Sequence, residues 1–271
     1  MHLIKLNNGV EIPQLGLGVF KTPDGDETYN AVTWALEAGY RHVDTARIYR
    51  NEPSVGRAIA DSPVPRDEVF VTTKVWNDDI RARRAAAAYQ ESLERLGMDH
   101  VDLLLTHWPV DGVYEAYGEL EKLYEAGKVR SIGVSNMKPH HLETLMQTAH
   151  ITPAVNQIES NPYFTNQASI DYCLERGIQV ETWAPLGGTG GNLLEDETLN
   201  ALAKKYGKSP AQVVIRWDIQ RGLICIPKST HKDRIAQNLD VWDFELSAAD
   251  MDAISALNRD AFTADPDTIT F

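Results

Sequence analysis

The chain has 271 residues, of which 43% are hydrophobic and 24% charged. That apolar content is enough to bury a sizeable core, so composition excludes a disordered or collagen-like chain. There are 26 Lys plus Arg against 39 Asp plus Glu, which gives a formal net charge of −13. This charge repels phosphate backbones and anionic lipid surfaces. We therefore expect no nucleic-acid or membrane partner, and any phosphate-bearing ligand needs a local basic cluster.

The cysteine content and the N-terminus indicate a cytoplasmic protein. Two cysteines, Cys173 and Cys225, cannot build a disulfide framework for a chain of this size, so a reducing compartment fits best. The first residues contain no apolar run long enough for a signal peptide, and no later segment approaches the about 18 apolar residues of a membrane span.

The opening residues predict a β-hairpin, and a repeating pattern of strands and helices follows it. Residues 2–6 alternate, Asn8-Gly9 is a strong two-residue turn signal, and strand character resumes at residues 10–12. Beyond the hairpin, short β-branched runs alternate with amphipathic stretches. The predicted strands are residues 15–19, 41–44, 69–74, 101–106, 129–134, 154–157, 179–183 and 223–226. The predicted helices lie near residues 26–38, 52–60, 81–96, 112–126, 139–148, 166–176, 195–206 and 231–238.

Eight strands and eight helices with no linker between them predict an α/β fold, a closed (β/α)8 TIM barrel. Such alternation is typical of a parallel sheet whose strands are buried by crossover helices. We expect a single domain over residues 1–271, with the hairpin at its N-terminus and two extra helices. Ser209-Pro210 signals one extra helix, and the capping box at residues 247–250 signals the other.

An open doubly wound sheet is the structural alternative, but its phosphate-binding fingerprint is missing. Gly16-Leu17-Gly18 starts like G-x-G-x-x-G, yet Lys21 stands where the third glycine belongs. Residues 187–191 are glycine-rich but lack the G-K-[ST] ending of a P-loop, so we interpret them as a flexible loop.

Four polar residues follow predicted strands at the carboxyl end of the barrel, where barrel enzymes carry their chemistry. Asp44 ends the second strand, Tyr49 lies in the loop after it, Lys74 ends the third strand, and His107 follows the fourth. Tyr49 and Lys74 are 25 residues apart and Lys74 and His107 are 33 apart, each close to one βα unit, so neighbouring strands should bring the four together. Taken singly, each is more often a solvated loop residue or a helix cap.

Together, the four groups form a coherent proton-donating device. A Lys74 ammonium within hydrogen-bond reach favours the phenolate of Tyr49 and lowers its pKa from about 10 toward working pH. Asp44 would hold Lys74 charged and oriented. His107 would orient a substrate carbonyl with one ring nitrogen.

No metal site or nucleophilic Ser or Cys is expected. The chain has no H-E-x-x-H, C-x-x-C or H-x-H, and His140-His141 are adjacent at a predicted helix start, where they should not face one ion together. There is also no G-x-S-x-G, and Cys173 falls in a predicted helix.

A series of motifs runs along essentially the whole chain: Gly39-Tyr40-Arg41-His42-Val43-Asp44-Thr45-Ala46 with Tyr49 and Asn51-Glu52, then Lys74-Val75-Trp76, His107-Trp108-Pro109, Ile132-Gly133-Val134-Ser135-Asn136, Asn156-Gln157, and Ile226-Pro227-Lys228-Ser229 with Arg234 and Asn238. In these motifs the chain resembles the aldo-keto reductase superfamily, most of all the bacterial branch similar to 2,5-diketo-D-gluconic acid reductases. Many members of the superfamily have Tyr at the position of Trp183, whereas Trp is typical of that branch.

The resemblance implies an oxidoreductase that binds NADPH without a Rossmann domain and reduces carbonyls to alcohols. Tyr49 would be the proton donor, and His107 would orient the carbonyl. Lys74 and Asp44 would adjust the pKa of Tyr49. Small or medium carbonyls would bind against the aromatic residues Phe20, Trp76 and Trp108 beside His107. The cofactor would be held by Ser135, Asn136 and Gln157 at the carboxamide, by Trp183 stacked on the ring, and by Leu186, Lys228, Ser229, Thr230, Arg234 and Asn238.

The residues around Lys228 supply the basic cluster that the acidic background requires. Lys228, Lys232 and Arg234 lie within seven residues and would suit a 2′-phosphate, which favours NADPH over NADH. The alternative is a solvated helix start with no ligand. Arg50 beside Tyr49 could attract acidic substrates or point to water, and the tail from residue 261 could fold over the site or fray.

Two alternatives of function stay open beside the reductase. One is a non-catalytic NADPH-binding module that senses redox state, and the other is a metal-dependent hydrolase on the same barrel. The four intact polar positions argue against the first. The resemblance implies a monomer.

Overall fold

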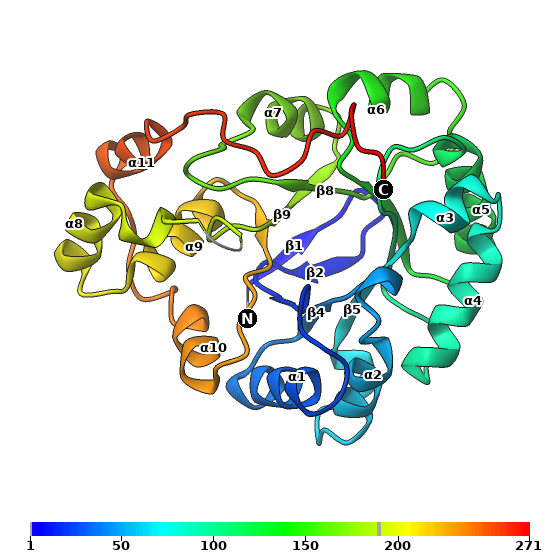
Figure 1. The fold of residues 1–271 in the computed structure, drawn as a ribbon, viewed down its shortest axis with the longest axis horizontal. Coiled ribbons are helices and arrows are strands. Elements are labelled where there is room, and N and C mark those ends of the chain that lie inside the picture. The colour runs from blue at the N-terminus through cyan, green and yellow to red at the C-terminus, as the bar shows by residue number, and fades with distance from the viewer. Residues whose placement is uncertain (1, 189–190) are drawn as a thin grey trace.

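Eight parallel strands form the barrel in a computed structural model that describes residues 2–188 and 191–271. Consecutive strands pair in chain order, and two parallel bridges, Leu15 with Cys225 and Gly18 with Lys228, close the ring. A Cβ at Gly18 would lie 2.9 Å from the Ile226 carbonyl oxygen, so glycine permits this closure. The predicted TIM barrel is confirmed (Figure 1). Its strands are β3 (Leu17–Gly18), β4 (His42–Asp44), β5 (Phe70–Val75), β6 (Leu103–Thr106), β7 (Ser131–Ser135), β8 (Val155–Glu159), β9 (Gln179–Trp183) and β10 (Ile224–Cys225).

The predicted N-terminal hairpin is also present, as β1 (Leu3–Lys5) paired antiparallel with β2 (Glu11–Pro13). It packs across the amino ends of the strands, where Leu6 and Ile12 join one buried cluster with Phe70, Leu103 and Val155. Burial of these side chains removes apolar surface from water and plugs this end of the barrel. The opposite, carboxyl end is left for polar residues.

Helices surround the barrel close to the predicted positions, with one break that the sequence pattern did not indicate. The predicted helix over residues 81–96 begins only at Ala85; Arg81 ends a separate short helix, and residues 82–84 between the two helices are non-helical, with a left-handed φ of 53° at Arg83. The buried carboxylate of Asp79 explains the break, because it pairs with Arg84 and with Arg47 from another loop. The helices are α1 (Asp26–Ala38), α2 (Glu52–Ala60), α3 (Asn77–Arg81), α4 (Ala85–Leu96), α5 (Val113–Glu125), α6 (Pro139–Leu145), α7 (Gln167–Glu175), α8 (Glu197–Tyr206), α9 (Pro210–Gln220), α10 (Lys232–Leu239) and α11 (Ala248–Ser255).

Besides the short α3, two of these helices lie outside the barrel layer, α8 and α11, which lie together beside α9 (Figure 1). We expected the helix beginning at Pro210 to be the extra one, but this helix, α9, packs against β10 and so occupies the barrel position. The outer pair has its own small core, in which Leu199, Leu202 and Ile254 pack on Trp217 of α9. Both extra helices exist, but the assignment of the first one was wrong.

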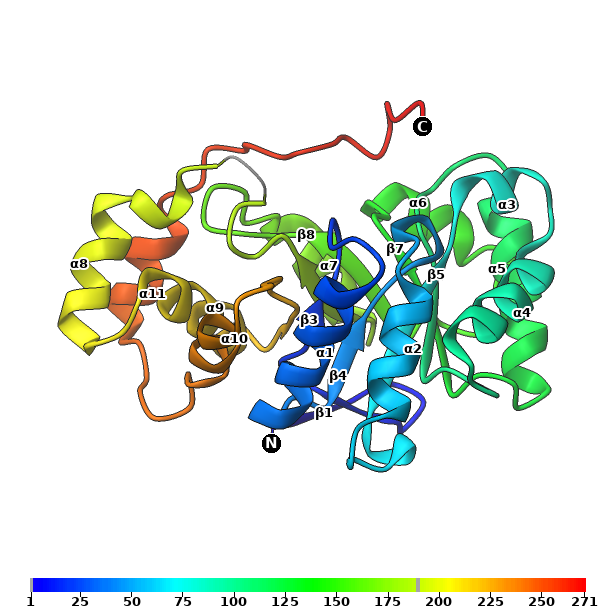
Figure 2. The same ribbon diagram turned by 60° about the horizontal axis from the view of Figure 1, so that its bottom comes forward.

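The C-terminal segment after α11 runs across the carboxyl end of the barrel (Figure 2). Of the two alternatives for the tail, the path across the mouth is the one that the structure shows. Part of the expected flexible loop, Thr189 and Gly190, lies outside the described residues. Across the ranges that are described, no helix combines the length and the apolar character needed to cross a bilayer.

Candidate active site

The four predicted polar residues converge at the carboxyl end of neighbouring strands. Asp44 ends β4, Lys74 lies near the end of β5, Tyr49 closes a short 3-10 turn (Arg47–Tyr49) after β4, and His107 follows β6. The Lys74 Nζ lies 2.7 Å from both carboxylate oxygens of Asp44 and 3.0 Å from the Thr45 carbonyl oxygen. It lies 3.4 Å from the Tyr49 hydroxyl oxygen, so one ammonium joins the acid to the phenol.

Lys74 is charged although it is fully buried. Burial alone would lower the pKa of its ammonium, but Asp44 and Tyr49 outweigh burial, and the net shift is upward. Burial raises the pKa of Asp44, while Lys74 and the amide of Gln157 oppose that rise. Gln157 donates a 2.8 Å hydrogen bond to one of the Asp44 carboxylate oxygens that Lys74 also binds. The pair is therefore a desolvated, fully hydrogen-bonded ion pair, the kind that breaks at a large cost.

The Tyr49 phenol is protonated at neutral pH. Burial raises its pKa to about 12, and Lys74 only partly opposes that rise. The expectation that Lys74 brings the pKa down to working pH is wrong for this state, because desolvation of the phenolate outweighs an ammonium at 3.4 Å. The phenol nevertheless has its proton available, with a cation in place to stabilise the oxygen once the proton leaves.

His107 is a neutral imidazole in an aromatic setting. Burial lowers its pKa well below the ordinary value, and the nearby Lys74 charge lowers it further. Its ring meets Trp76 edge-on at 5.1 Å and Tyr49 edge-on at 5.8 Å between centroids. A neutral imidazole beside a phenol can donate one hydrogen bond to a carbonyl oxygen that faces both groups.

Aromatic rings form the walls around these polar groups, as the sequence predicted for Phe20, Trp76 and Trp108. Phe20 packs on Tyr49 at 4.9 Å between centroids. The structure adds Phe271, which stacks parallel to Trp76 at 6.1 Å and meets Trp108 edge-on at 5.4 Å. Phe271 was missed because nothing in its local sequence shows where the tail runs.

Polar contacts hold the tail in this position. The main-chain oxygen of Phe271 accepts hydrogen bonds from Asn77 at 2.9 Å and Arg81 at 3.0 Å. Farther back, Lys138 at the start of α6 pairs with Asp265 at 2.5 Å and Asp267 at 2.6 Å. One anchor holds the last residue and the other holds the chain a few residues before it, so together they fix the Phe271 ring over the mouth.

The residues predicted to grip a nicotinamide carboxamide form one connected group at the ends of β7, β8 and β9. Ser135 Oγ donates to the Gln157 carbonyl oxygen at 2.8 Å, and Asn136 Nδ2 donates to Ser135 Oγ at 3.0 Å. Trp183 Nε1 donates to Asn136 Oδ1 at 2.8 Å. Asn136 has a left-handed φ of 60°, a conformation that Asn tolerates better than most residues. These contacts lock the amide orientations, and Gln157 ties the group to Asp44.

Comparison with known proteins identifies the family. A sequence profile described as the Aldo/keto reductase family matches residues 14–259. The chain belongs to this family.

Named relatives match almost the whole chain. A 9,11-endoperoxide prostaglandin H2 reductase of Trypanosoma cruzi (strain CL Brener) is 51% identical over 98% of this chain and 95% of its own length. Glyoxal reductase of Bacillus subtilis (strain 168) is 50% identical over 99% of this chain and 97% of its own length. Methylglyoxal reductase DkgA of Escherichia coli (strain K12) is 43% identical over 95% of this chain and 94% of its own length.

Solved structures agree with this family assignment. An aldo-keto reductase from a Medee basin deep-sea metagenome library superposes with a TM-score of 0.96 at 46% identity, covering 100% of both chains. A Bombyx mori aldo-keto reductase in complex with NADP superposes with a TM-score of 0.88 at 40% identity, covering 96% of this chain and 94% of that chain.

The predicted phosphate cluster of this aldo-keto reductase fits an anionic group. Lys228 and Arg234 are exposed, and neither has an acidic partner among the described residues. Lys232 is different, because it pairs with Glu37 at 2.9 Å. Two uncompensated cations on a protein of net charge −13 favour a phosphate at this place. The donor set therefore fits NADPH through Lys228 and Arg234, and Lys232 is set apart from it.

The remaining predicted cofactor residues lie before α10, on α10 and after β9. Ser229 is buried and accepts a hydrogen bond from the His231 amide at 3.2 Å, which shapes the turn before α10. Asn238 is buried on α10, and Thr230 is half-buried. Leu186, after β9, is half-buried and packs against both the barrel core and the outer helix core.

His140 and His141 do converge, contrary to the expectation from their adjacency. The Nε2 atoms lie 2.9 Å and 3.2 Å from the same Asp267 oxygen. They still do not suit a metal ion, because Nδ1 of His141 accepts a hydrogen bond from the Lys138 amide. That acceptance leaves the proton of the neutral ring on Nε2, the atom that a metal would need. The cluster therefore anchors the tail.

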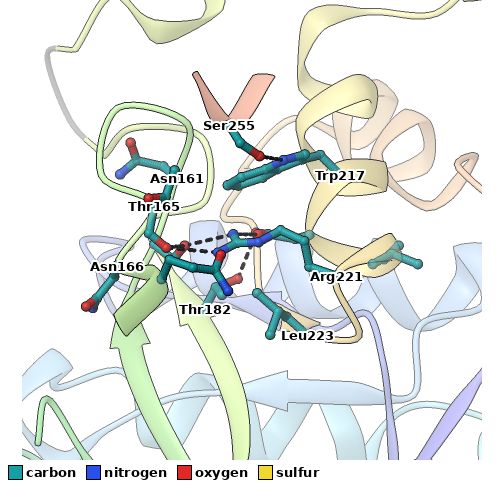
Figure 3. A network of polar contacts seen from close by, with 12 residues as sticks. Asn161, Thr165, Asn166, Thr182, Trp217, Arg221, Leu223 and Ser255 are labelled. Carbon is teal, nitrogen blue, oxygen red and sulfur yellow. Dashed lines mark hydrogen bonds and ion pairs between the residues drawn. The ribbon is translucent and has the colours of Figure 1, made fainter. Parts of the chain in front are cut away.

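A buried polar network behind β9 was not indicated by the sequence (Figure 3). Thr182, next to Trp183, donates to Asp218 of α9 at 2.9 Å. Arg221, directly after α9, pairs with Asp218 at 3.2 Å and donates to the Thr165 carbonyl oxygen at 2.9 Å. The network clamps β9 and the loop after β8 to one helix, and so fixes the strand end that carries Trp183.

A cavity of about 550 Å³ lies under the tail, beside the residues predicted to bind the nicotinamide carboxamide. Asn136 and Trp183 form one side, and Met137, Phe164 and Phe262 form much of the rest. Neither Tyr49 nor Lys74 lines it. The cavity is thus adjacent to the proposed cofactor site and not the space in front of the proton donor.

Proposed function

We propose that this single-domain aldo-keto reductase is an NADPH-dependent enzyme that reduces small aldehydes and ketones to alcohols. The observation that carries the proposal is the Tyr49 phenol held 3.4 Å from the Lys74 ammonium, which is itself hydrogen-bonded to Asp44. Such a site can give a proton to a carbonyl oxygen and stabilise the phenolate that remains.

Each protein group has one role in this reaction. NADPH would be held by the connected residues at the ends of β7, β8 and β9 and by the Lys228 and Arg234 cations. When bound, it supplies the hydride that reduces the carbonyl carbon. Tyr49 donates its proton to the carbonyl oxygen, so that hydride and proton together give the alcohol. Lys74 stabilises the phenolate as it forms, and His107 donates a hydrogen bond that orients the carbonyl oxygen.

The substrates we propose are small α-dicarbonyls, keto-esters and diketo-sugar acids such as 2,5-diketo-D-gluconate. The aromatic walls leave little space for large substrates, since Phe271 stacks over Trp76 and Trp108 at the mouth. The names of two relatives, glyoxal reductase and methylglyoxal reductase, support the α-dicarbonyls. Arg50 is exposed at this rim and supports acidic substrates. We further propose that the protein is a cytoplasmic monomer.

The test compares wild type with Tyr49→Phe on a panel of α-dicarbonyls, keto-esters and diketo-sugar acids, measured as loss of NADPH absorbance. We expect Tyr49→Phe to abolish turnover, because the proton is gone, and to keep NADPH binding, measured by fluorescence titration. Turnover within a few-fold of wild type would refute the role of Tyr49. If wild type bound NADPH but reduced no carbonyl, the redox-sensing module would replace the reductase.

A further inference from the structure

Glu181 is a fully buried acid inside the barrel whose carboxylate has no hydrogen-bond partner. It lies on β9, paired in register with Gln157 of β8 and Ile224 of β10, and none of its side chain is exposed. Neither oxygen accepts a hydrogen bond. Other buried acids in the described part of the chain are matched, for example Glu52 with Arg95 and Asp218 with Arg221. An unpartnered buried carboxylate is costly and calls for a physical account.

The neighbours of Glu181 explain why no cation neutralises it. His42 of β4 is nearest, with Nε2 3.8 Å from Oε1, but burial lowers the pKa of that imidazole to about 3, so it is neutral. His42 Nε2 instead hydrogen-bonds with Thr72 at 3.1 Å. Lys74 of β5 already gives two hydrogen bonds to Asp44. Gln157, the register partner of Glu181 on β8, is a neutral amide that donates a hydrogen bond to Asp44.

A carboxyl group in this position keeps its proton at neutral pH. Burial and the Asp44 charge raise the pKa of Glu181 to about 8, and Lys74 and Gln157 only partly oppose that rise. The charged form of Glu181 in turn raises the pKa values of Tyr49, Lys74 and Cys225. Among these neighbours, Glu181 is the group whose ionisation falls on the mildly alkaline side, since the pKa of His42 lies far below and that of Tyr49 far above.

We propose that Glu181 is a positioning residue for the proton donor: its buried, unpartnered carboxyl group holds a proton inside the barrel, and loss of that proton weakens proton donation by Tyr49. With Glu181 neutral, the Asp44 and Lys74 charges cancel and the phenolate forms beside a net-neutral pair. With Glu181 ionised, an extra negative charge opposes the one that develops on the Tyr49 oxygen. This inference rests on the proposed carbonyl reduction.

The kinetic test compares wild type, Glu181→Gln and Glu121→Gln in single-turnover NADPH oxidation with a carbonyl substrate. Gln copies the protonated acid, so Glu181→Gln should match wild type within about threefold near pH 6. Toward about pH 9.5 we expect the wild-type rate to fall about three- to tenfold through one ionisation, and the Glu181→Gln rate to stay level. Glu121 is a matched control, because it is a buried acid of α5 that binds the His150 and Ile151 amides far from the barrel interior. Glu121→Gln should follow wild type.

Two kinetic outcomes would overturn the proposal. A Glu181→Gln profile parallel to wild type would show that Glu181 does not act on Tyr49. A uniform loss at every pH would show a merely structural role.

A second readout does not depend on turnover. Infrared spectroscopy of the protein without substrate should show a protonated carboxyl band that fades as pH rises through about 8 and is missing in Glu181→Gln. The band should persist in Glu121→Gln. Absence of the band in wild type at about pH 6 would overturn the proposal. If wild type reduced no carbonyl, the proposed function would fail by itself, and the band would still decide whether Glu181 holds the proton.

Discussion

Replacement of Asp44 by Asn removes one negative charge from the centre of the site and keeps the side-chain shape. Lys74 would then stay fully buried without a counter-ion, with the Thr45 carbonyl and one amide oxygen as its remaining acceptors. The new amide nitrogen would also face a donor, because one carboxylate oxygen of Asp44 now accepts from Lys74 alone and the other from both Lys74 and Gln157. Removing one partner of such a pair typically costs about 3–5 kcal/mol.

The cost of Asp44→Asn should depend on pH in a defined direction. In the wild type the pKa of Lys74 is raised, so its contribution to stability is present below the ordinary lysine value of about 10.4 and is lost only above it. In the variant the raising influence of Asp44 is gone and burial, which lowers the pKa, remains. Lys74 should then lose its proton on folding. The stability deficit should be largest at neutral and acid pH and shrink as pH rises toward about 10.

Urea unfolding at several pH values measures this deficit. We expect a lower midpoint with an unchanged slope, and a double variant with Lys74→Met that is more stable than Asp44→Asn alone, because no unpaired charge is left. A stability deficit below about 1 kcal/mol at every pH would refute the claim that Asp44 and Lys74 form a desolvated ion pair, because an exposed ion pair contributes no more than that. A deficit that grew as pH rose would refute the assignment of the cost to the Lys74 charge.

Two further predictions concern the ends of the site. Lys228→Ala and Arg234→Ala should each weaken NADPH binding about tenfold, as for a lost charge-assisted hydrogen bond, and leave NADH binding nearly unchanged in calorimetric titration; equal losses for both cofactors would exclude a role at the 2′-phosphate. Asp267→Ala should loosen the tail, since Asp267 pairs with Lys138 and with two imidazoles. The variant should speed proteolysis near the C-terminus while changing global stability by less than about 1 kcal/mol. An unchanged digestion pattern would contradict the anchoring role.

The barrel and the four polar residues could be predicted because both follow from the βα repeat. The carboxyl ends of successive parallel strands meet at one edge, so Asp44, Lys74 and His107 had to lie together once each was placed at a strand end. Tyr49 followed from its short distance along the chain from Asp44. Local sequence carries this information because each residue belongs to an element that its own pattern predicts.

The features that escaped prediction depend on contacts between distant segments. Phe271 reaches the mouth because Lys138 and Asn77, more than a hundred residues earlier, bind the tail. The break after α3 depends on Arg47, in the 3-10 turn after β4, pairing with Asp79 of α3. Neither partner can be recognised from its neighbours in the sequence, since a surface Lys or Arg has the same local pattern with or without an acid opposite it.

Burial and charge have different roles in proton donation at this site. Burial keeps the Tyr49 phenol protonated, with a pKa of about 12, and keeps the His107 imidazole neutral. Lys74 therefore does not act by ionising Tyr49 in the resting protein. It acts when the proton leaves, because a cation 3.4 Å away in a water-poor interior stabilises the new phenolate far more than it could in water. For that stabilisation to count fully, the surroundings of Lys74 must not carry excess negative charge, and a protonated Glu181 beside Asp44 meets this condition at neutral pH.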